Sequence, residues 1–549
     1  MNDYLTKKKH FQNRLEILKD LRSKRETEWK EEIMYLSPDS GSFDDPSSDK
    51  WNKKEPYYKL NINTLPSFYL KNLATALVSN LTPSRVKWFN LSVDDETREE
   101  SIWLTNCVKK MFTLFGNAGL YEHLYNTYLE SAVFGPNVLG MQGDINKVYD
   151  FVPMTIGEFW LAEGENGLVN TVYRRFAMSN IQLYERFGED NLPKKIKDEL
   201  ARDNTECFHN VIHAIEPNPR YLPRWDNQFN KPYISAYYLE DECADEFLEY
   251  KGMSYFPFLV ARWDKVGGSV YGNGIGRFIL GDVKSLQAYE RDLARASKKR
   301  ISPPLKGSLE MKNAVKDISA EGITYTNDPD GFTALYQVNY DTGEALNNIT
   351  RIAQRIYSQT YNDLFYALLN KDKTMSATEA SGIEQEKLTM LGSVVDRLQN
   401  EFLTPLVQGA FLIGLEAGEF GQMPQSLIGK ELKIRYQSLL SMAQELSDLT
   451  NVERYLQFTA SAGSLNTDAL KKPDMLKIMD YYAQHLGLDL TLVKTNDTVN
   501  QEKEAEMLAQ QQAMQQQQQM EALQAGAKAA KDYADAQTIS GGAIEDLLG

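Results

Sequence analysis

Cysteine, histidine and long apolar runs are all scarce in this chain. Three cysteines and five histidines occur among 549 residues, and Cys107, Cys207 and Cys243 are too widely spaced for a Cys-x-x-Cys metal pair. Their odd number argues against a disulfide framework and suits a reducing cytoplasm. The longest apolar run, Phe402 to Leu415, is shorter than a membrane span and contains Pro405. We therefore expect no membrane segment, and no apolar signal core follows the first ten residues.

Basic residues are in deficit, because 60 lysines and arginines stand against 76 aspartates and glutamates, for a formal net charge of -16. Proteins that wrap nucleic acid tightly carry a basic surplus, so this balance argues against that class. The acidic balance is still compatible with a protein that lets DNA slide past without binding it tightly. The hydrophobic share of 42% is enough to bury sizeable cores, and the length exceeds that of a usual single domain.

In the first half, apolar residues at helical spacing predict four helices followed by a mixed α+β region. The helices are expected from Phe11 to Leu36, Leu65 to Leu81, Glu96 to Phe115 and Leu120 to Phe134. From Val148 to Arg262 short β-rich runs are separated by turn residues. Among them we expect strands at Thr171 to Phe176, Val211 to Ile215 and Phe256 to Val260, and a short helix at Asn180 to Phe187.

The second half predicts two long helices separated by a small β module. The first runs from Phe278 to Arg300 and stops at Pro303-Pro304, and apolar spacing from Leu346 to Ala367 marks the second. Strands are expected at Glu321 to Thr326 and Phe332 to Val338. Such an order would form an antiparallel helix pair with a knob at one end. A further helix opens at a capping box, Ser376 to Glu379, and runs through Phe402 toward Pro405.

The segment from Gln501 to Asp535 is dominated by Gln, Ala, Glu and Met and contains no proline. Its helix propensity is high, but its apolar anchors are few, chiefly Met507, Leu508, Met514, Met520 and Leu523. A helix of this kind is marginal alone and could form a bundle or barrel beside copies of itself. The alternative interpretation is a disordered Gln-rich tail.

Several motifs in consistent order, from about Phe11 to Pro424, carry a family resemblance. They are Leu81-Thr82-Pro83-Ser84-Arg85 with Trp88-Phe89-Asn90-Leu91, Val172-Tyr173-Arg174-Arg175-Phe176, Arg262-Trp263 with Tyr271-Gly272-Asn273-Gly274-Ile275-Gly276, Asp282-Val283-Lys284 with Pro303-Pro304-Leu305, and Met375 to Glu379 with Arg397-Leu398, Glu401 and Pro405-Leu406. Together they resemble the portal, or head-to-tail connector, proteins of short-tailed bacteriophages. Phe134-Gly135-Pro136-Asn137 departs from the family pattern, and the Gln-rich extension is variable among relatives.

The resemblance implies an α+β, mainly helical subunit that assembles into a ring, usually of twelve copies. It would divide into a wing (1–277), a first stem helix (278–301), a clip (302–342), a second stem helix (343–369), a channel loop (370–375), a long helix and crown (376–500), and a Gln-rich barrel or tail (501–549). Twelve copies, each with a net charge of -16, would give an acidic channel that repels phosphate and keeps DNA mobile.

The same resemblance implies the function and the partners. The ring would conduct double-stranded DNA into the capsid during packaging and out through the tail at ejection. Its other partners would be the terminase large subunit, tail adaptor or nozzle proteins, and the major capsid and scaffolding proteins. The protein would be made in the host bacterial cytoplasm and reside at the portal vertex of the virion. The alternatives are another ring-forming structural or scaffold protein of the virion, and a DNA-processing enzyme whose site no motif reveals.

Two sets of residues are candidates for contact with DNA or with a partner. Lys284, Arg291, Arg295 and Lys298 lie on one face of the first stem helix, where a salt-bridged or solvated face is the alternative. Lys371 and Lys373, in the loop that the resemblance places in the channel, are candidates for transient phosphate contact. On the clip, the candidate contacts are Leu305, Tyr325, Phe332 and Tyr336, which could equally form its core.

No enzyme, cofactor or metal site is expected. Gly272, Gly274 and Gly276 do not complete a Rossmann fingerprint, because position 277 is Arg277, and no phosphate-binding G-x-x-x-x-G-K-[ST] motif occurs. His209 and His213, with Cys207 nearby, could suggest zinc, but on a strand the two histidines would lie about 13 Å apart, too far for joint ligation. The acidic cluster from Glu240 to Glu246 is typical of a solvated turn. The portal resemblance implies that a partner hydrolyses the ATP that drives packaging.

Overall fold

The computed structural model describes residues 8–41, 43, 46, 61–224, 227, 229–240, 246–307, 332–335, 341–363, 391–436, 452–462, 469, 471–485, 493–494 and 496–545. The chain divides into two compact units, Met1–Leu440 and Ser441–Gly549.

The helices of the first unit follow from apolar residues at helical spacing and from clear end signals. They are α1 (Lys8–Leu36), α2 (Leu65–Leu81), α3 (Arg98–Asn117), α4 (Leu120–Phe134), α5 (Asn180–Phe187), α6 (Lys194–Leu200), α7 (Ile275–Ile301), α8 (Thr342–Gln359) and α11 (Thr404–Glu416). A capping box of Thr97 and Glu100 begins α3, and Ser179 with Gln182 begins α5 in the same way. The predicted bounds of α2, α4 and α5 are confirmed to the residue.

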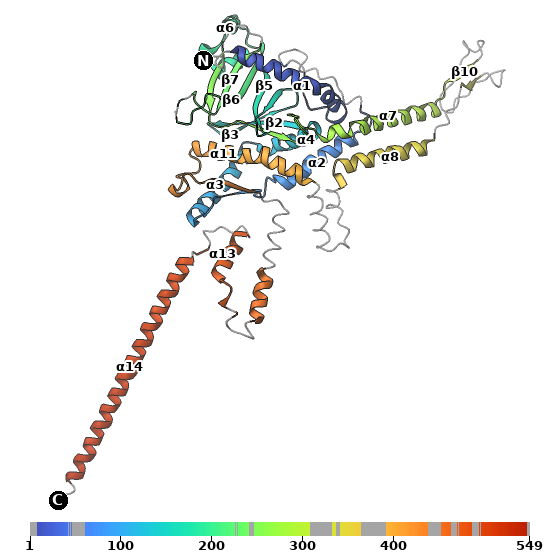
Figure 1. Cartoon of the computed structure of the whole chain (residues 1–549). Coiled ribbons are helices and arrows are strands. Elements are labelled where there is room, and N and C mark those ends of the chain that lie inside the picture. The colour runs from blue at the N-terminus through green and yellow to red at the C-terminus, as the bar shows by residue number, and fades with distance from the viewer. Residues whose placement is uncertain are drawn as a thin grey trace. The chain divides into compact units, whose positions relative to one another are not determined.

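Two antiparallel sheets of three and five strands form most of the β part of the first unit (Figure 1). The larger has the order β4-β5-β6-β7-β8 and the smaller β3-β2-β9. Their strands are β2 (Pro136–Asp144), β3 (Val148–Met154), β4 (Phe159–Glu163), β5 (Val169–Ser179), β6 (Phe208–Pro217), β7 (Tyr233–Leu239), β8 (Glu249–Met253) and β9 (Phe258–Arg262). The predicted mixed α+β region is thereby confirmed.

Helix α4 lies within the main core. Leu120, Leu124, Tyr128 and Phe134 of this helix are fully buried among side chains of α2, α7 and β2. A second core forms where α1 crosses the larger sheet, and there Phe11 packs on Tyr173 and Tyr238 with ring centroids 6.5 Å apart. The amphipathic pattern predicted for the N-terminal helix therefore corresponds to a face buried on the sheet.

A third pairing connects residues that are far apart in the sequence and was not predicted. Strand β1 (Phe89–Ser92) pairs antiparallel with β12 (Lys433–Tyr436). The helix predicted to run toward Pro405 continues past it, because a π-helical turn, Gln399–Leu403, leads directly into α11. Pro405 occupies the first turn of α11, where a missing backbone N–H costs no intrahelical hydrogen bond.

Helices α7 and α8 lie side by side and form an arm, with the strand pair β10 (Leu305–Gly307) and β11 (Phe332–Ala334) at its end (Figure 1). The strand predicted at Phe332 to Val338 is found in part, paired with β10, whereas the strand predicted at Glu321 to Thr326 lies outside the described residues. The second helix ends earlier than predicted. Thr360 Oγ1 donates to the Ile356 carbonyl at 2.8 Å, and Tyr361 has a positive φ of 55°, which breaks the helical path.

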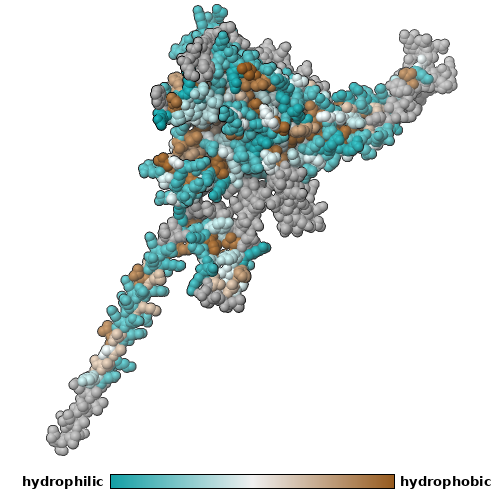
Figure 2. Space-filling view, viewed as in Figure 1, coloured by the Kyte–Doolittle hydropathy of each residue, from teal (hydrophilic) through white to brown (hydrophobic). Residues whose placement is uncertain are grey.

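The second unit contains α13 (Met475–His485) and α14 (Asn496–Glu545). Helix α14 spans 50 residues and confirms the helical interpretation of the Gln-rich tail. Its apolar anchors are exposed, with Met507 at 61% and Met514 at 69%. Figure 2 shows isolated apolar patches along this largely hydrophilic helix.

Candidate functional site

The start of α7 is attached to the body through two glycines of the Tyr271 to Gly276 motif. A Cβ atom on Gly274 would lie 2.2 Å from the Val133 carbonyl oxygen, and one on Gly276 would lie 2.4 Å from the same atom. Both distances are far below any tolerated contact, so the arm meets α4 where only glycine fits. The motif therefore acts as a close backbone junction between the arm and α4.

Polar contacts fix the arm further along the helix. The side-chain oxygen of Gln287 accepts hydrogen bonds from the backbone nitrogens of Ile62 and Asn63, at 2.9 and 3.0 Å. Its nitrogen donates to the Asn63 carbonyl at 2.6 Å. Gln287 is 1% exposed, so this three-bond contact holds the segment before α2 against α7. An ion pair of Arg277 with Glu28, at 3.0 Å, connects α7 to α1.

The four basic residues predicted on one face of α7 lie in different surroundings. Lys284 forms an ion pair with Glu31 of α1 at 2.8 Å and lies over the ring of Tyr35. Arg291 is partly exposed. Arg295 and Lys298 lie further out and are exposed, and Arg295 is 4.0 Å from Asp292. Three basic groups thus remain at the outer part of the arm, and their contact with DNA stays a prediction.

An ion pair connects the two helices of the arm. Arg355 near the end of α8 holds Asp282 near the start of α7, with Nε donating at 2.7 Å and a second nitrogen completing a two-pronged contact. Because the end of one helix meets the start of the other, the pair is antiparallel, as the sequence predicted. The two-pronged geometry fixes the register of the helices more firmly than a single contact would.

The end of the arm carries exposed apolar side chains, which we call the arm tip: Ile301, Leu305 and Leu335. They are 82%, 43% and 56% exposed, respectively. Leu305 was predicted as a partner contact, and Phe332, predicted with it, pairs in register with Gly307. The remaining candidates, Tyr325, Tyr336, Lys371 and Lys373, lie outside the described residues.

A buried arginine connects the β domain to the helix that follows the arm. Arg262 at the end of β9 is fully buried and donates to Glu401 at 2.6 and 2.7 Å, to Glu163, and to the Gly167 and Val270 carbonyls. Burial lowers the pKa of Arg262, but hydrogen bonds and the charges of the two carboxylates outweigh it and raise the pKa overall. The guanidinium therefore stays charged, and this cluster is structural.

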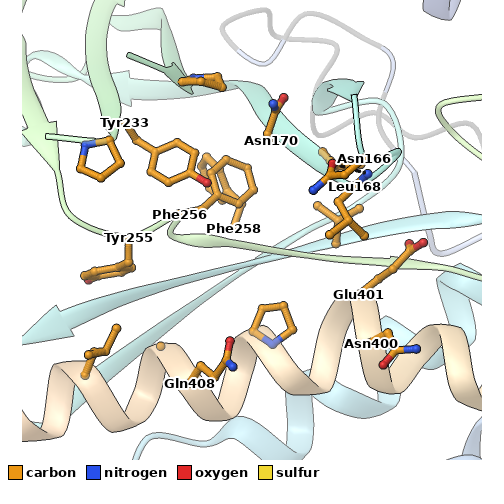
Figure 3. Close-up of a pocket in the computed structure, with 17 residues that line it drawn as sticks. Asn166, Leu168, Asn170, Tyr233, Tyr255, Phe256, Phe258, Asn400, Glu401 and Gln408 are labelled. Atoms are coloured by element: carbon orange, nitrogen blue, oxygen red, sulfur yellow. Dashed lines mark hydrogen bonds between the residues drawn. The ribbon is translucent and has the colours of Figure 1, made fainter. Parts of the chain in front are cut away.

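A cavity of about 470 Å³ lies beside this cluster, between the strands and the helix that includes α11. Figure 3 shows Tyr233, Tyr255, Phe256 and Phe258 opposite the helix that carries Glu401. Glu401 is the carboxylate of this cavity, and it is already engaged by Arg262. The lining is mainly aromatic and amide side chains, which suits packing against apolar groups more than acid–base chemistry.

The two histidines considered for zinc point to different partners. His213 is buried, stacks on Tyr237 with centroids 3.8 Å apart, and contacts Ser235 at 3.0 Å. His209 contacts Glu199 at 3.1 Å. Of the predicted acidic turn, the structure describes Glu240 and Glu246. Glu240 forms an ion pair with Lys19 at 3.0 Å. In the described part of the chain no helix is long and apolar enough to cross a membrane.

Comparison with known proteins assigns this chain, with its mixed helices and strands and its helical arm, to a family. The family model described as bacteriophage head to tail connecting protein matches residues 8–493, so the chain belongs to that family. It is 30% identical over 542 residues to the "Probable portal protein" of Bordetella phage BPP-1, covering 96% of each chain. It is 29% identical over 552 residues to the "Portal protein" of Salmonella phage epsilon15, covering 98% of this chain and 97% of that one.

These matches confirm the portal resemblance predicted from the ordered motifs. Both relatives are named as portal proteins, and neither name describes an enzyme. A phage head-to-tail connector is a component of the virion, which agrees with the predicted location.

Proposed function

We propose that the chain is the subunit of a ring, of about twelve copies, that conducts double-stranded DNA into the capsid and later out through the tail. The proposal rests on the family match and on one structural observation, the antiparallel arm of α7 and α8 with its small strand pair. In this assignment α7 and α8 are the stem, residues 302–342 the clip, and residues 1–277 the wing.

Exposed apolar side chains on the arm support assembly into a ring. Phe278 on α7 is 63% exposed and Leu346 on α8 is 52% exposed, although both are large and apolar. In a ring, the arm of one subunit would pack against the arm of the next and cover such side chains. Figure 2 shows apolar atoms at intervals along the arm.

The arm tip supports docking of partners. Three exposed apolar residues at one end of each arm would become a ring of apolar contacts in the assembly. The terminase motor during packaging, and tail adaptor proteins afterwards, are the partners proposed for this surface. Capsid and scaffolding proteins would contact the wing.

The charge distribution supports a channel that does not retain DNA. The chain carries a net charge of -16, so the assembled ring is strongly acidic and repels phosphate over most of its surface. Against that background Lys371 and Lys373, together with Arg291, Arg295 and Lys298, provide the proposed transient contacts. Weak, exchangeable contacts of this kind guide DNA without stopping it.

The double variant Lys371→Ala with Lys373→Ala tests the channel assignment. We expect rings to form normally while the length or amount of packaged DNA falls, measured by gel analysis of DNA extracted from heads. A matched control is Lys109→Ala with Lys110→Ala, on helix α3 outside the arm, which should leave packaging unchanged. Unchanged packaging in the loop variant would exclude these lysines as channel contacts.

A further inference from the structure

Three side chains with metal-binding atoms meet beside β6, away from the arm and the channel candidates. They are Glu199 at the end of α6, Cys207 just before β6, and His209 within β6. A carboxylate oxygen, the Sγ atom and a ring nitrogen all lie within 4.8 Å of one another. His209 Nε2 lies 3.1 Å from Glu199 Oε2.

The local fold explains why these residues meet. Cys207 and His209 are two positions apart in extended chain, so their side chains lie on the same face. The backbone nitrogen of Asn204 donates to the Glu199 carbonyl at 3.0 Å, and that of Asn180 donates to the Cys207 carbonyl at 3.0 Å. These two bonds turn the chain back after α6 and bring Glu199 against the start of the strand.

A buried side chain orients the carboxylate from behind. Asn180 is fully buried, and its side-chain nitrogen donates to Glu199 Oε2 at 2.9 Å and to the Asn204 carbonyl at 2.8 Å. Metal-binding carboxylates are commonly held by hydrogen bonds of this kind from a second layer of residues. Glu199 and His209 are themselves 20% and 13% exposed, so an ion can reach them from solvent.

We propose that Glu199, Cys207 and His209 bind one zinc ion, with a water molecule as the fourth ligand. Sulfur, imidazole nitrogen and carboxylate oxygen are the three donors that zinc takes in proteins. A tetrahedral zinc ion needs its ligand atoms about 3.5 Å apart, and the three candidate ligand atoms all lie within 4.8 Å of one another. Hard cations such as Mg²⁺ prefer oxygen ligands alone, which the thiol and imidazole disfavour.

Proton release should accompany binding. Burial raises the pKa of the Cys207 thiol, and the charge and hydrogen bond of Glu199 raise it further, whereas Lys195 acts in the opposite direction. An ordinary cysteine thiol is largely protonated at neutral pH, and zinc binds the thiolate. Zinc ligation replaces that proton, so the affinity should fall as the pH is lowered. In the bound state the ion would hold α6 and the loop after it against β6.

The test uses the full chain, freed of metal with a chelator and dialysed. Titration with Zn²⁺ against a chromophoric chelator should show one ion per chain, and titration with Co²⁺ should give a thiolate-to-cobalt charge-transfer band. Cys207→Ser and His209→Ala should each lose the band and weaken zinc binding by at least about 100-fold. Asn180→Ala should weaken it by about 10- to 100-fold.

Matched controls separate this site from other thiols and histidines. Cys107→Ser and Cys243→Ser remove the remaining cysteines. His10→Ala removes a histidine that, like His209, contacts a glutamate, here Glu216 at 2.8 Å. All three should bind zinc like the unmodified chain. Equal thermal unfolding of the metal-free Cys207→Ser and unmodified chains shows that the fold is retained. No stoichiometric zinc, no thiolate band, or unchanged binding in Cys207→Ser would overturn the proposal.

Discussion

Arg262 and Glu401, separated by 139 residues, form a two-pronged ion pair in which Nε donates at 2.6 Å and Nη2 at 2.7 Å. Arg262 belongs to the Arg-Trp motif at the end of the β-rich region, and Glu401 to the motif of the long helix later in the chain. Two segments that carried the family resemblance separately are therefore in direct contact. This contact fastens the β part of the first unit to the helix that leads into α11.

The first prediction concerns this pair. Glu401→Ala leaves the fully buried guanidinium of Arg262 with half of its compensating charge, so the free energy of unfolding should fall by about 3 kcal/mol or more. Chemical denaturation of the purified chain measures this. The control is Asp94→Ala, which removes the partner of Lys433 from an exposed pair and should cost at most about 1 kcal/mol. Equal costs for the two variants would contradict the structural role of the buried pair.

The second prediction concerns the junction at the base of the arm. Gly274→Ala forces a Cβ atom to 2.2 Å from the Val133 carbonyl oxygen, so α7 must shift or α4 must move. The expected cost is about 1–3 kcal/mol, with reduced ring formation by native mass measurement.

Gly281→Ala is the matched control for the junction. Gly281 lies on the same helix with open space around it, so alanine there should stabilise the chain by about 0.5–1 kcal/mol through helix propensity. If both variants shifted the unfolding transition in the same direction, the close contact with Val133 would not matter.

The third prediction concerns a buried carboxyl on α1. Glu32 is fully buried, and among the described residues neither of its carboxylate oxygens has a hydrogen-bond partner. Burial, aided by the charge of Glu28, raises its pKa to about 8 from an ordinary 4.5. Between those two pH values the folded chain binds more protons than the unfolded chain, so the stability contributed by protonated Glu32 is lost as pH rises toward 8.

Replacing this carboxyl should remove the loss. Glu32→Met should raise the free energy of unfolding by about 1–3 kcal/mol at pH 8, with a smaller gain at pH 5. Denaturation curves at both pH values measure the difference. Glu31→Gln, which changes an exposed partner of Lys284 one position away, should alter stability by less than about 1 kcal/mol at both. A larger gain at pH 5 than at pH 8 would show the opposite linkage and contradict the assignment.

The sequence predicted elements best where local signals mark both ends. Helix α2 begins with Pro66 in its first turn and ends before Thr82-Pro83, and α5 has a capping box and a following glycine, so their bounds were found to the residue. The end of α8 was missed because Tyr361 adopts a left-handed conformation that its residue type does not signal. The pairing of β1 with β12 joins residues more than 300 positions apart in the chain, which no local pattern encodes.

For the candidate sites too, the sequence signals some of the residues, and long-range packing determines the others. A basic stripe at helical spacing was visible in the sequence, but the ion pair that engages Lys284 depends on the packing of α1 against α7. The spacing of Cys207 and His209 was also visible. Their third partner, Glu199, comes from a helix that precedes the strand, and only the turn held by Asn180 brings it near. Long-range packing therefore decides which of the signalled side chains share a site.

Electron microscopy of the purified chain, with two-dimensional class averages and native mass across a range of concentrations, tests the central proposal most directly. The account predicts closed rings of about twelve subunits with an open axial channel, in which the arms of neighbouring subunits lie side by side. Closed particles with no axial channel, at every concentration at which the chain assembles, would contradict it.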